Sequence, residues 1–497
     1  MADPAPPRPP RRAPSRVLSR VPAVVLVVVL VAGLGVVIAT GWSPADAWRW
    51  WRDLPEDTAP GPGTSPDPST SPAAVPPPPE LTLPPIPRAR PAAAAADSRA
   101  LDPTRVRLAV AGGLLDPRLG RHVVAAVAPL ATGRPVFSSG TGPFIPASTT
   151  KLLTATAALE TLGPGHRFTT RAVAAGGDRV ILVGGGDPYL ASRPAGSAYP
   201  ARADVATLAR RTAQALRQRG TTRVRVGYDT SLFGGPVGSV RWEPDYLPDD
   251  VVAPITALWV DGGRSPSGYG RVDDPAAVAA ENYAVALARA GIEVRGRPRA
   301  TEAGPRASEL ASVRSGTLAQ IVERVLDVSD NEAAEVLAHH VGLAAGGAGS
   351  FADGARGTLA TLRGLGVPLG GVELYDGSGL SRSNRITPAA LLAVLRVAAA
   401  EDHPRLRSVI TGIPVAGFTG SLAYRFDDGP RAGRGRVRAK TGTLTGVHGL
   451  AGVATDLDGN AISFVLIADR VRARNALDAR QTIDQVAGAI GACRCGA

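Results

Sequence analysis

The chain has 497 residues, too many for a single hydrophobic core, so we expect two or three domains together with non-globular segments. Part of its net charge of +12 comes from arginines within residues 1–20, and the other arginines are scattered without interleaved aromatic residues, which argues against a nucleic-acid partner. The six histidines and two cysteines form no metal-binding motif, so neither a metal nor a cofactor is expected.

The first 40 residues have the pattern of a membrane anchor. Arginines crowd residues 1–20, which we expect to be cytoplasmic, and residues 21–39 carry no charge. Because an apolar run of this length can cross a bilayer as a helix, residues 21–40 are predicted to be a single-pass anchor in the cell membrane, with the catalytic domain outside. The competing interpretation is a signal peptide cleaved near Ala45-Asp46-Ala47, which would leave a secreted protein.

Residues 41–100 are rich in proline, serine, threonine and alanine, and they include Val75-Pro76-Pro77-Pro78-Pro79. A segment of this composition buries too little apolar surface to fold and adopts extended conformations. We therefore predict a proline-rich linker that holds the folded part away from the membrane.

Apolar runs at both ends of the folded part predict one antiparallel sheet with helices packed on it. The expected strands are residues 123–128, 135–138, 437–441, 448–454 and 461–468. Asp458-Gly459 is a favourable turn for the last hairpin. Helices are predicted at residues 147–162 and 474–490.

Residues 171–310 are predicted to form an inserted α/β domain. Short strands at residues 179–183 and 224–226 alternate with helical patterns at residues 205–218 and 276–290. A segment of this length is too long for a simple connection between two elements.

Only two of the 55 basic residues are lysines, Lys151 and Lys440. Arginine keeps its proton near neutral pH, whereas a buried lysine can act as a base, so these are positions where arginine cannot do the chemistry. Lys151 ends the sequence Ser148-Thr149-Thr150-Lys151, whose first and last side chains share one helix face. Alone, such a sequence is usually ordinary helix surface.

Two further motifs follow. Ser329-Asp330-Asn331 precedes a helical pattern and, taken alone, is typical of a helix N-cap. Lys440-Thr441-Gly442-Thr443 ends a predicted strand and, taken alone, is typical of a turn. The order of the three motifs, with lysine used nowhere else, indicates a serine active site.

These motifs resemble those of the penicillin-recognising serine enzymes, Ser-x-x-Lys, Ser-x-Asn and Lys-Thr-Gly. Over residues 105–490 the sequence is similar to low-molecular-mass penicillin-binding proteins of the D-alanyl-D-alanine carboxypeptidase/endopeptidase type, the penicillin-binding protein 4 group. The similarity also rests on Leu162-Gly163-Pro164, Arg167-Phe168, Gly186-Asp187-Pro188, Asp376-Gly377-Ser378-Gly379-Leu380-Ser381-Arg382 and Gly420-Ser421-Leu422.

The resemblance implies an α+β fold. Residues 101–170 and 311–497 would form a β-lactamase/transpeptidase-like domain, with an antiparallel sheet, covering helices and a helical subdomain. Peptidoglycan stem peptides and β-lactam antibiotics would be its partners. A β-lactamase-like hydrolase and a catalytically silent cell-wall-binding module are the alternative functions.

The residue types suggest a role for each motif. Ser148 would attack the carbonyl of the penultimate D-alanine, and neutral Lys151 would take its proton. Lys440 would help to keep Lys151 neutral by charge repulsion. Ser329 would pass a proton to the departing D-alanine, and Asn331 would hold the substrate amide.

The remaining candidates bind substrate. Lys440 and Thr441 would receive the terminal carboxylate, with Gly442 beside them in the substrate-binding motif, and the N–H groups of Ser148 and Thr443 would form the oxyanion hole. By resemblance, Arg382, Leu444 and Thr445 would line a pocket for the peptide side chain, with Asp245 as its acidic member. Asp245 is equally well interpreted as part of a surface loop, and residues 376–382 are interpreted as a plain glycine-rich turn.

Cys493 and Cys495 lie within the last five residues. Two cysteines so close together do not make a disulfide framework, so a flexible tail is predicted there.

Overall fold

The computed structural model describes residues 100–497, which belong to one compact unit. The predicted cytoplasmic segment, membrane anchor and nearly all of the linker fall on residues 1–99, outside the described part. Within residues 100–497, no helix combines the length and the apolar composition needed to cross a bilayer.

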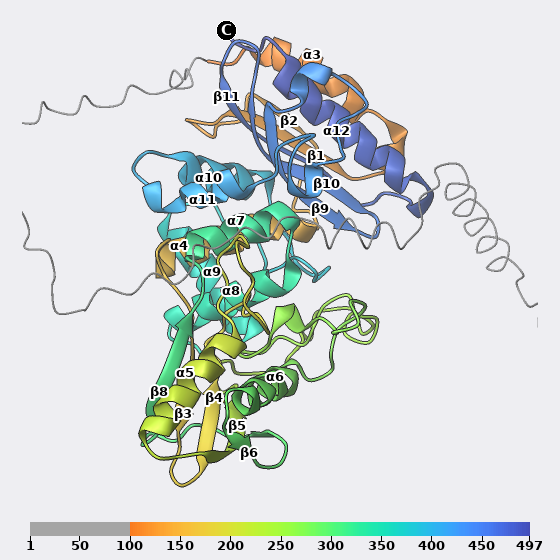
Figure 1. Ribbon diagram of the computed structural model, residues 1–497. Coiled ribbons are helices and arrows are strands. Elements are labelled where there is room, and N and C mark those ends of the chain that lie inside the picture. Colours follow the sequence, from red (N-terminus) through yellow and green to blue (C-terminus); the bar gives the residue numbers. More distant parts are fainter. Residues whose placement is uncertain (1–99) are drawn as a thin grey trace, which may run out of the picture. The chain divides into compact units, whose positions relative to one another are not determined.

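A five-stranded antiparallel sheet joins the two ends of the folded chain (Figure 1). Its strands are β1 (Val123–Pro129), β2 (Phe137–Ser139), β9 (Val437–Leu444), β10 (Val447–Thr455) and β11 (Ala461–Ala468). The order β2-β1-β11-β10-β9 confirms the predicted sheet, with the early strand β1 paired to the late strand β11.

Helices cover both faces of this sheet. They are α3 (Pro103–Leu114), α4 (Thr150–Leu162), α10 (Pro388–Ala399) and α12 (Ala476–Ala492). In β1, Ala125 and Val127 pack into the core shared with α3 and α12, whereas Val124 and Ala126 pack into the core shared with α4 and α10. The strand is therefore apolar at successive positions, because neither face meets water.

A helical layer carries the second motif. It consists of α7 (Leu318–Val328), α8 (Asn331–Ala344), α9 (Phe351–Gly364) and α11 (Arg407–Gly412). Ile321 and Val325 of α7 pack in the same core as α4, so this layer holds the second motif beside the first. Short 3-10 helices connect the larger elements: η1 (Pro117–Leu119), η2 (Ala147–Thr149), η3 (Asp261–Gly263), η4 (Pro404–Leu406), η5 (Gly420–Leu422), η6 (Arg431–Gly433) and η7 (Ala473–Asn475).

The chain between the first two motifs contains a second, mixed sheet. Its strands are β3 (Thr169–Ala174), β4 (Arg179–Val183), β5 (Arg223–Asp229), β6 (Glu293–Val294), β7 (Arg299–Ala300) and β8 (Ser308–Arg314), in the order β6-β5-β4-β3-β8 with β7 also paired to β5. The parallel pair β4 and β5 is connected through α5 (Val205–Gln218), and α6 (Pro275–Arg289) follows β5.

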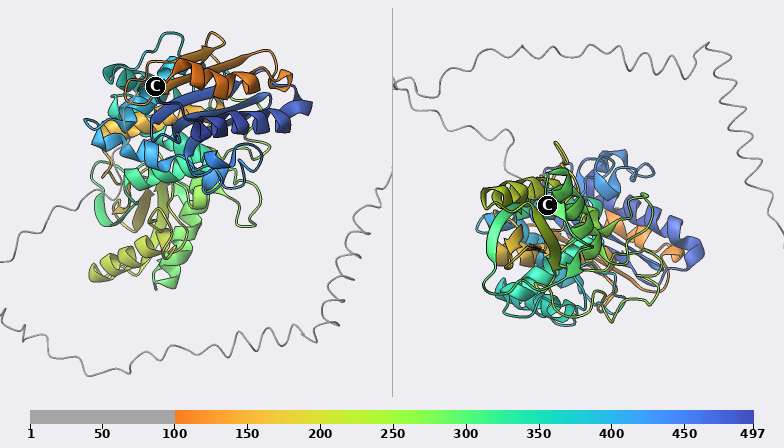
Figure 2. Two further views of the ribbon diagram at one scale, coloured as in Figure 1. Left: turned by 90° about the horizontal axis from the view of Figure 1, so that it is seen from above. Right: turned by 60° about the horizontal axis from the view of Figure 1, so that its bottom comes forward.

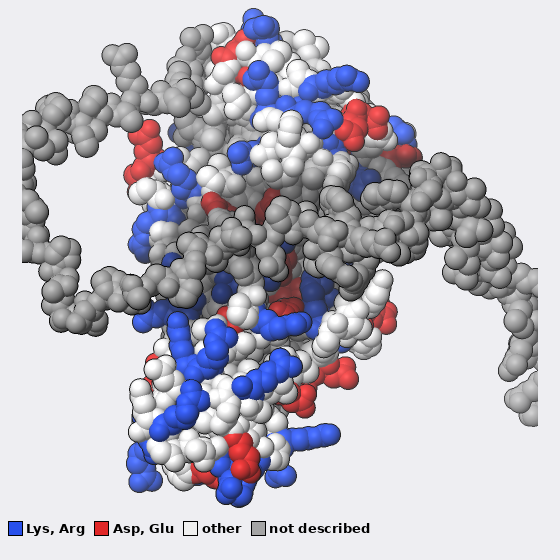
Figure 3. All heavy atoms as spheres, in the orientation of Figure 1, with Lys and Arg blue, Asp and Glu red and all other residues white. Residues whose placement is uncertain are grey.

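This second sheet shares a hydrophobic core with α5 and α6. The two helices begin and end within one residue of the predicted limits. The sheet itself runs from residue 169 to residue 314, slightly beyond the predicted limits of 171–310. Its elements lie apart from the first sheet in Figures 1 and 2, and blue arginine side chains are scattered over this lower part in Figure 3. That residues 171–310 are a separate inserted domain stays a prediction.

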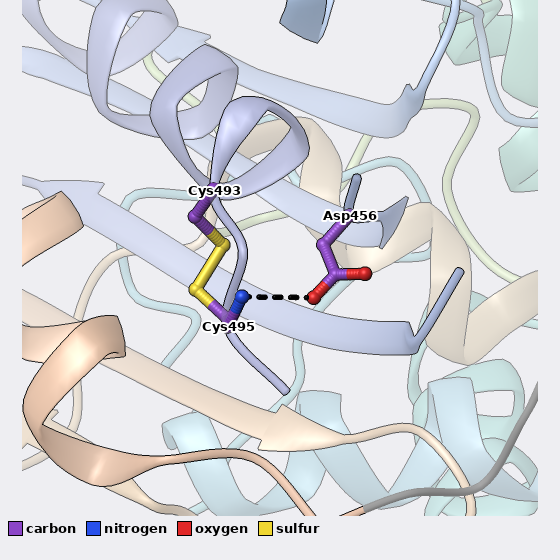
Figure 4. Close-up of side chains that lie close together, drawn as sticks. All are labelled: Asp456, Cys493 and Cys495. Atoms are coloured by element: carbon purple, nitrogen blue, oxygen red, sulfur yellow. Dashed lines mark hydrogen bonds between the residues drawn. A yellow bond between two sulfur atoms is a disulfide. The ribbon is translucent and has the colours of Figure 1, made fainter. Parts of the chain in front are cut away.

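The prediction of a flexible C-terminal tail is wrong. Cys493 and Cys495 are joined by a disulfide, and the Cys495 N–H donates to the Asp456 carboxylate at 3.1 Å (Figure 4). Cys495 is buried, and its carbonyl accepts from the N–H of Asp102 at 2.9 Å. Sequence spacing gave no sign of this contact, because its partners lie far away in the chain.

Candidate active site

Ser148 lies in η2, the 3-10 turn that runs directly into α4. The preceding residue, Ala147, has a φ of 47°, in the left-handed region that residues with a side chain rarely adopt. The hydroxyl of Thr150 donates to the Ala147 carbonyl at 2.9 Å and that of Thr149 donates to the Pro146 carbonyl at 2.8 Å. These bonds hold the strained turn that presents Ser148, which is only half-buried.

Two glycines allow other segments to approach this turn. A Cβ atom on Gly379 would lie 1.9 Å from the Ala147 carbonyl oxygen, and Gly379 has a φ of 88°. A Cβ atom on Gly442 would lie 2.8 Å from the Pro146 carbonyl oxygen. Both positions therefore require glycine for the chain to pack this closely around Ser148.

Lys151 is fully buried on the first turn of α4. Its Nζ lies 3.0 Å from the Oγ of Ser148, 2.8 Å from the Oδ1 of Asn331 and 2.7 Å from the carbonyl oxygen of Ser378. The structure thus joins the first motif, the second motif and the glycine-rich segment at one nitrogen.

Burial lowers the pKa of Lys151 to about 8. The nearby carboxyl groups of Glu335 and Asp376, and to a smaller extent those of Asp330 and Glu332, oppose this by raising the pKa. The sequence predicts that a buried lysine can act as a base and that repulsion from Lys440 helps to keep Lys151 neutral. Desolvation is the largest cause of the lowered pKa, because the ammonium form loses its water on burial.

The second motif spans the break between α7 and α8. Ser329 ends α7 with a φ of 61°, and Asp330 caps α8 by accepting from the N–H of Ala333 at 3.0 Å. The N-cap interpretation is therefore right for Asp330, while Asn331 points to Lys151. Ser329 is half-buried, and no hydrogen bond links its hydroxyl to either lysine in the described chain.

The third motif lies on β9, the edge strand beside η2. Lys440 is fully buried, and its Nζ donates to the carbonyl of Thr441 at 3.1 Å. Burial, followed by the charges of Lys151 and Arg425, lowers the pKa of Lys440 well below its usual value. The hydroxyls of Thr441 and Ser421 lie 3.2 Å apart.

The predicted side-chain pocket is only partly assembled. A guanidinium nitrogen of Arg382 donates to the carbonyl of Thr445 at 2.9 Å, and Leu444 packs against the cluster that contains Trp242 and Leu380. Thr443 is exposed near the C-terminal end of β9. Asp245 is exposed, and no ion pair joins it to Arg382 within residues 100–497.

Sequence reasoning missed Glu335 and Asp376. Glu335 is fully buried on α8 and accepts from the N–H groups of Gly377 and Ser378, each at 2.8 Å. Asp376 accepts from the indole N–H of Trp242 at 2.9 Å. Residues 376–382, which were interpreted as a plain turn, are therefore held by two buried carboxyl groups. Their Ser378 carbonyl is a hydrogen-bond acceptor for Lys151.

One group of side chains has the residue types of a metal site. Asp456, Cys493 and Cys495 bring their ligand atoms close together. Both sulfur atoms belong to the disulfide, so no thiolate is present to bind a metal. Asp456 instead accepts a hydrogen bond from the N–H of Cys495 and so holds the C-terminal residues in place.

The sequence matches the D-Ala-D-Ala carboxypeptidase 3 (S13) family over residues 106–271 and 266–490. The chain belongs to this family. It is 35% identical over 421 residues to carboxypeptidase DacB of Mycolicibacterium smegmatis, which covers 82% of this chain and 89% of that protein. It is 29% identical over 460 residues to a D-alanyl-D-alanine carboxypeptidase of an Actinomadura species, covering 74% and 81%.

The S13 fold is also seen in a solved structure. Penicillin-binding protein 4 of Haemophilus influenzae matches with a TM-score of 0.59 at 20% identity, covering 77% of this chain and 98% of that one. The predicted resemblance is thus confirmed: the protein is a serine-type D-Ala-D-Ala carboxypeptidase, and it has the fold of penicillin-binding protein 4.

Proposed function

We propose that this carboxypeptidase cleaves peptidoglycan stem peptides through an acyl-enzyme on Ser148 and that it also acts as an endopeptidase on cross-linked peptides. The contacts of Lys151 are the main support. A neutral amine has two N–H donors and one lone pair. Two of its neighbours, the oxygens of Asn331 and Ser378, can only accept, so the lone pair is left for the hydroxyl hydrogen of Ser148.

The other motifs complete the reaction. The Ser148 Oγ bonds to the carbonyl carbon of D-alanine, and the C–N bond then breaks as the leaving amine takes a proton through Ser329. Lys440 and Thr441 bind the carboxylate next to that amine, and the N–H groups of Ser148 and Thr443 stabilise the oxyanion. Water then hydrolyses the ester and restores the Ser148 hydroxyl.

The stem-peptide side chain is proposed to bind beside Arg382, Leu444 and Thr445, where two segments meet. Asp245 follows Trp242 closely in the chain, and the indole N–H of Trp242 donates a hydrogen bond to Asp376. In this proposal a substrate amino group would draw the exposed Asp245 carboxylate toward Arg382.

Labelled penicillin tests the acyl-enzyme. The wild-type protein should be labelled at Ser148, and the Ser148→Ala variant should not. Lys151→Arg should also fail, because guanidinium stays protonated at any working pH. Labelling of Lys151→Arg at the wild-type rate would disprove the general-base role. Release of the label within seconds would favour the alternative, a β-lactamase-like hydrolase.

We also propose that the protein is held in the cell membrane with its catalytic domain outside, because charged residues precede the apolar run at 21–39. Deleting residues 1–40 should leave the protein in the cytoplasm and move penicillin labelling of the lysed cells from the membrane fraction to the soluble fraction. A mature protein that starts near Trp48 in the culture medium would show instead that the segment is a cleaved signal peptide.

A further inference from the structure

A cavity of about 480 Å³ opens beside the second motif. Ser329 and Asn331 line it from the turn between α7 and α8, and Tyr189 lines it from the segment that contains the second sheet. A cavity of this size suits a drug-sized ligand. It is therefore much larger than a single departing D-alanine requires.

The cavity is lined by four arginines, Arg202, Arg264, Arg271 and Arg324. Arg271 is paired with Glu332 at 2.7 Å. The other three have no ion-pair partner within residues 100–497. Arg202 lies over the ring of Tyr189, with its guanidinium carbon 5.7 Å from the ring centre. Three guanidinium groups from separate segments thus face one space.

The acidic side chains of the same walls are already engaged. Asp330 caps α8 and accepts from the hydroxyl of Tyr189 at 3.3 Å. Glu332 binds Arg271, and Asp261 accepts from the N–H of Ser192 at 3.2 Å. The unpaired arginines therefore give the cavity donors that match carboxylate groups.

The cavity adjoins the reacting groups. Asn331 lines it and also contacts Lys151, and Ser329 is the group that passes a proton to the leaving amine in the proposed mechanism. Whatever is attached to that amine beyond its first residue must extend past Ser329. The open space past Ser329 is the arginine-lined cavity.

We propose that this cavity binds the carboxylates of a second stem peptide on the leaving side of the scissile bond, so that the enzyme prefers cross-linked peptides to single ones. This inference rests on the proposed function. The chemistry is unchanged: the acyl group passes to Ser148, and the amine that leaves belongs to an anionic peptide instead of free D-alanine.

The test compares two substrates. One is a single stem peptide ending in D-Ala-D-Ala, and the other is a cross-linked dimer whose leaving strand has free carboxylates. In the double variant Arg264→Gln/Arg324→Gln, the ratio of kcat/KM for the dimer to that for the single peptide should fall by about 10- to 100-fold, the loss expected for charged hydrogen bonds. The loss should lie mainly in KM.

Controls separate the two proposals. Arg107→Gln, an exposed change on α3, should keep the wild-type ratio. A dimer should be a poor substrate for the wild type when its leaving-strand carboxylates are converted to amides, except for the one next to the scissile amine, which Lys440 and Thr441 bind. This dimer should lose little more in the double variant. Penicillin labelling reports whether each protein has an intact active site.

An unchanged ratio in the double variant would overturn the cavity assignment alone. A wild-type enzyme that releases D-alanine but does not cut the dimer would overturn both the cavity assignment and the proposed endopeptidase activity, and would leave the carboxypeptidase activity standing. A wild-type protein that neither reacts with penicillin nor cuts either substrate would overturn the proposed function instead.

Discussion

Glu335 shows how a single buried residue can set the properties of the general base. Burial, and after it the neighbouring Asp376, raises its pKa to about 8. Its two oxygens hold the N–H groups of Gly377 and Ser378, and the carbonyl of Ser378 contacts Lys151. We therefore regard Glu335 as a positioning residue for the lysine.

The wild-type acylation rate should rise with pH, with a midpoint near the Lys151 pKa of about 8, because only the neutral amine can take a proton. Glu335→Gln removes a charge that raises this pKa, so the midpoint should move to lower pH. The rate at high pH should also fall by about tenfold, because one N–H of the Gly377 segment loses its acceptor.

Penicillin labelling rates measured between pH 6 and 10 check this prediction. Glu160→Gln, near the far end of α4, is the matched control and should keep the wild-type midpoint. A Glu335→Gln profile with an unchanged midpoint would show that Lys151 does not feel this carboxyl group.

At the scale of the element, α8 follows directly on the turn that carries Ser329, and it contains two adjacent buried histidines, His339 and His340. The His340 Nε2 lies 3.0 Å from the carbonyl oxygen of Gly186, and its ring stacks on Phe168 with centroids 4.2 Å apart. Burial lowers the pKa values of His339 and His340 to about 4. The helix therefore depends on both rings staying neutral.

This dependence predicts acid sensitivity. Above the unfolded-state pKa of about 6.5 both rings are neutral in either state, and between about 6.5 and 4 only the unfolded chain takes up protons. Stability should be fully present above pH 6.5 and fall toward pH 4, by about 3 kcal/mol for each histidine.

Urea unfolding at pH 7.5 and pH 5 measures the effect. In His340→Gln, whose amide does not titrate and can still donate to the Gly186 carbonyl, the loss between these pH values should be about half that of the wild type. An equal loss in both proteins would mean that other groups cause the acid sensitivity.

The limits of a helix could be predicted where its apolar periodicity and its capping residue agree. In α5, apolar residues recur on one face of the helix and arginines on the other, and Asp204 caps its N-terminus. This helix has the predicted limits. Glu335 could not be identified in this way, because it occupies a position in the apolar pattern of α8 and its partners lie in a distant loop. The motifs identified Ser148, Lys151 and Asn331, but not the segment of Ser378 that unites them.

At the scale of the whole molecule, the C-terminal tail closes the core between α3 and α12. Deleting residues 493–497 removes buried Cys495 and its bonds to Asp102 and Asp456. We expect this to lower the free energy of unfolding by at least about 3 kcal/mol, because the chain loses one small apolar side chain and several hydrogen bonds between the tail and the residues around it.

Urea denaturation of the truncated protein tests this expectation. Arg494→Ala is the matched control: Arg494 pairs with Asp458 but is largely exposed, so its loss should cost under about 1 kcal/mol. A truncated protein as stable as this control would show that the tail adds nothing beyond a surface ion pair.

The pairing of β1 with β11 has a consequence for synthesis on the ribosome. The turn that bears Ser148 emerges early, but the strand that carries Lys440 and the strand that completes the sheet are among the last to be made. Until they arrive, β1 has an unpaired edge and its apolar side chains lack a cover. Nascent chains should therefore depend on chaperones until β11 has been made, and a premature stop between Ser148 and β11 should yield a protein with its nucleophile but no activity.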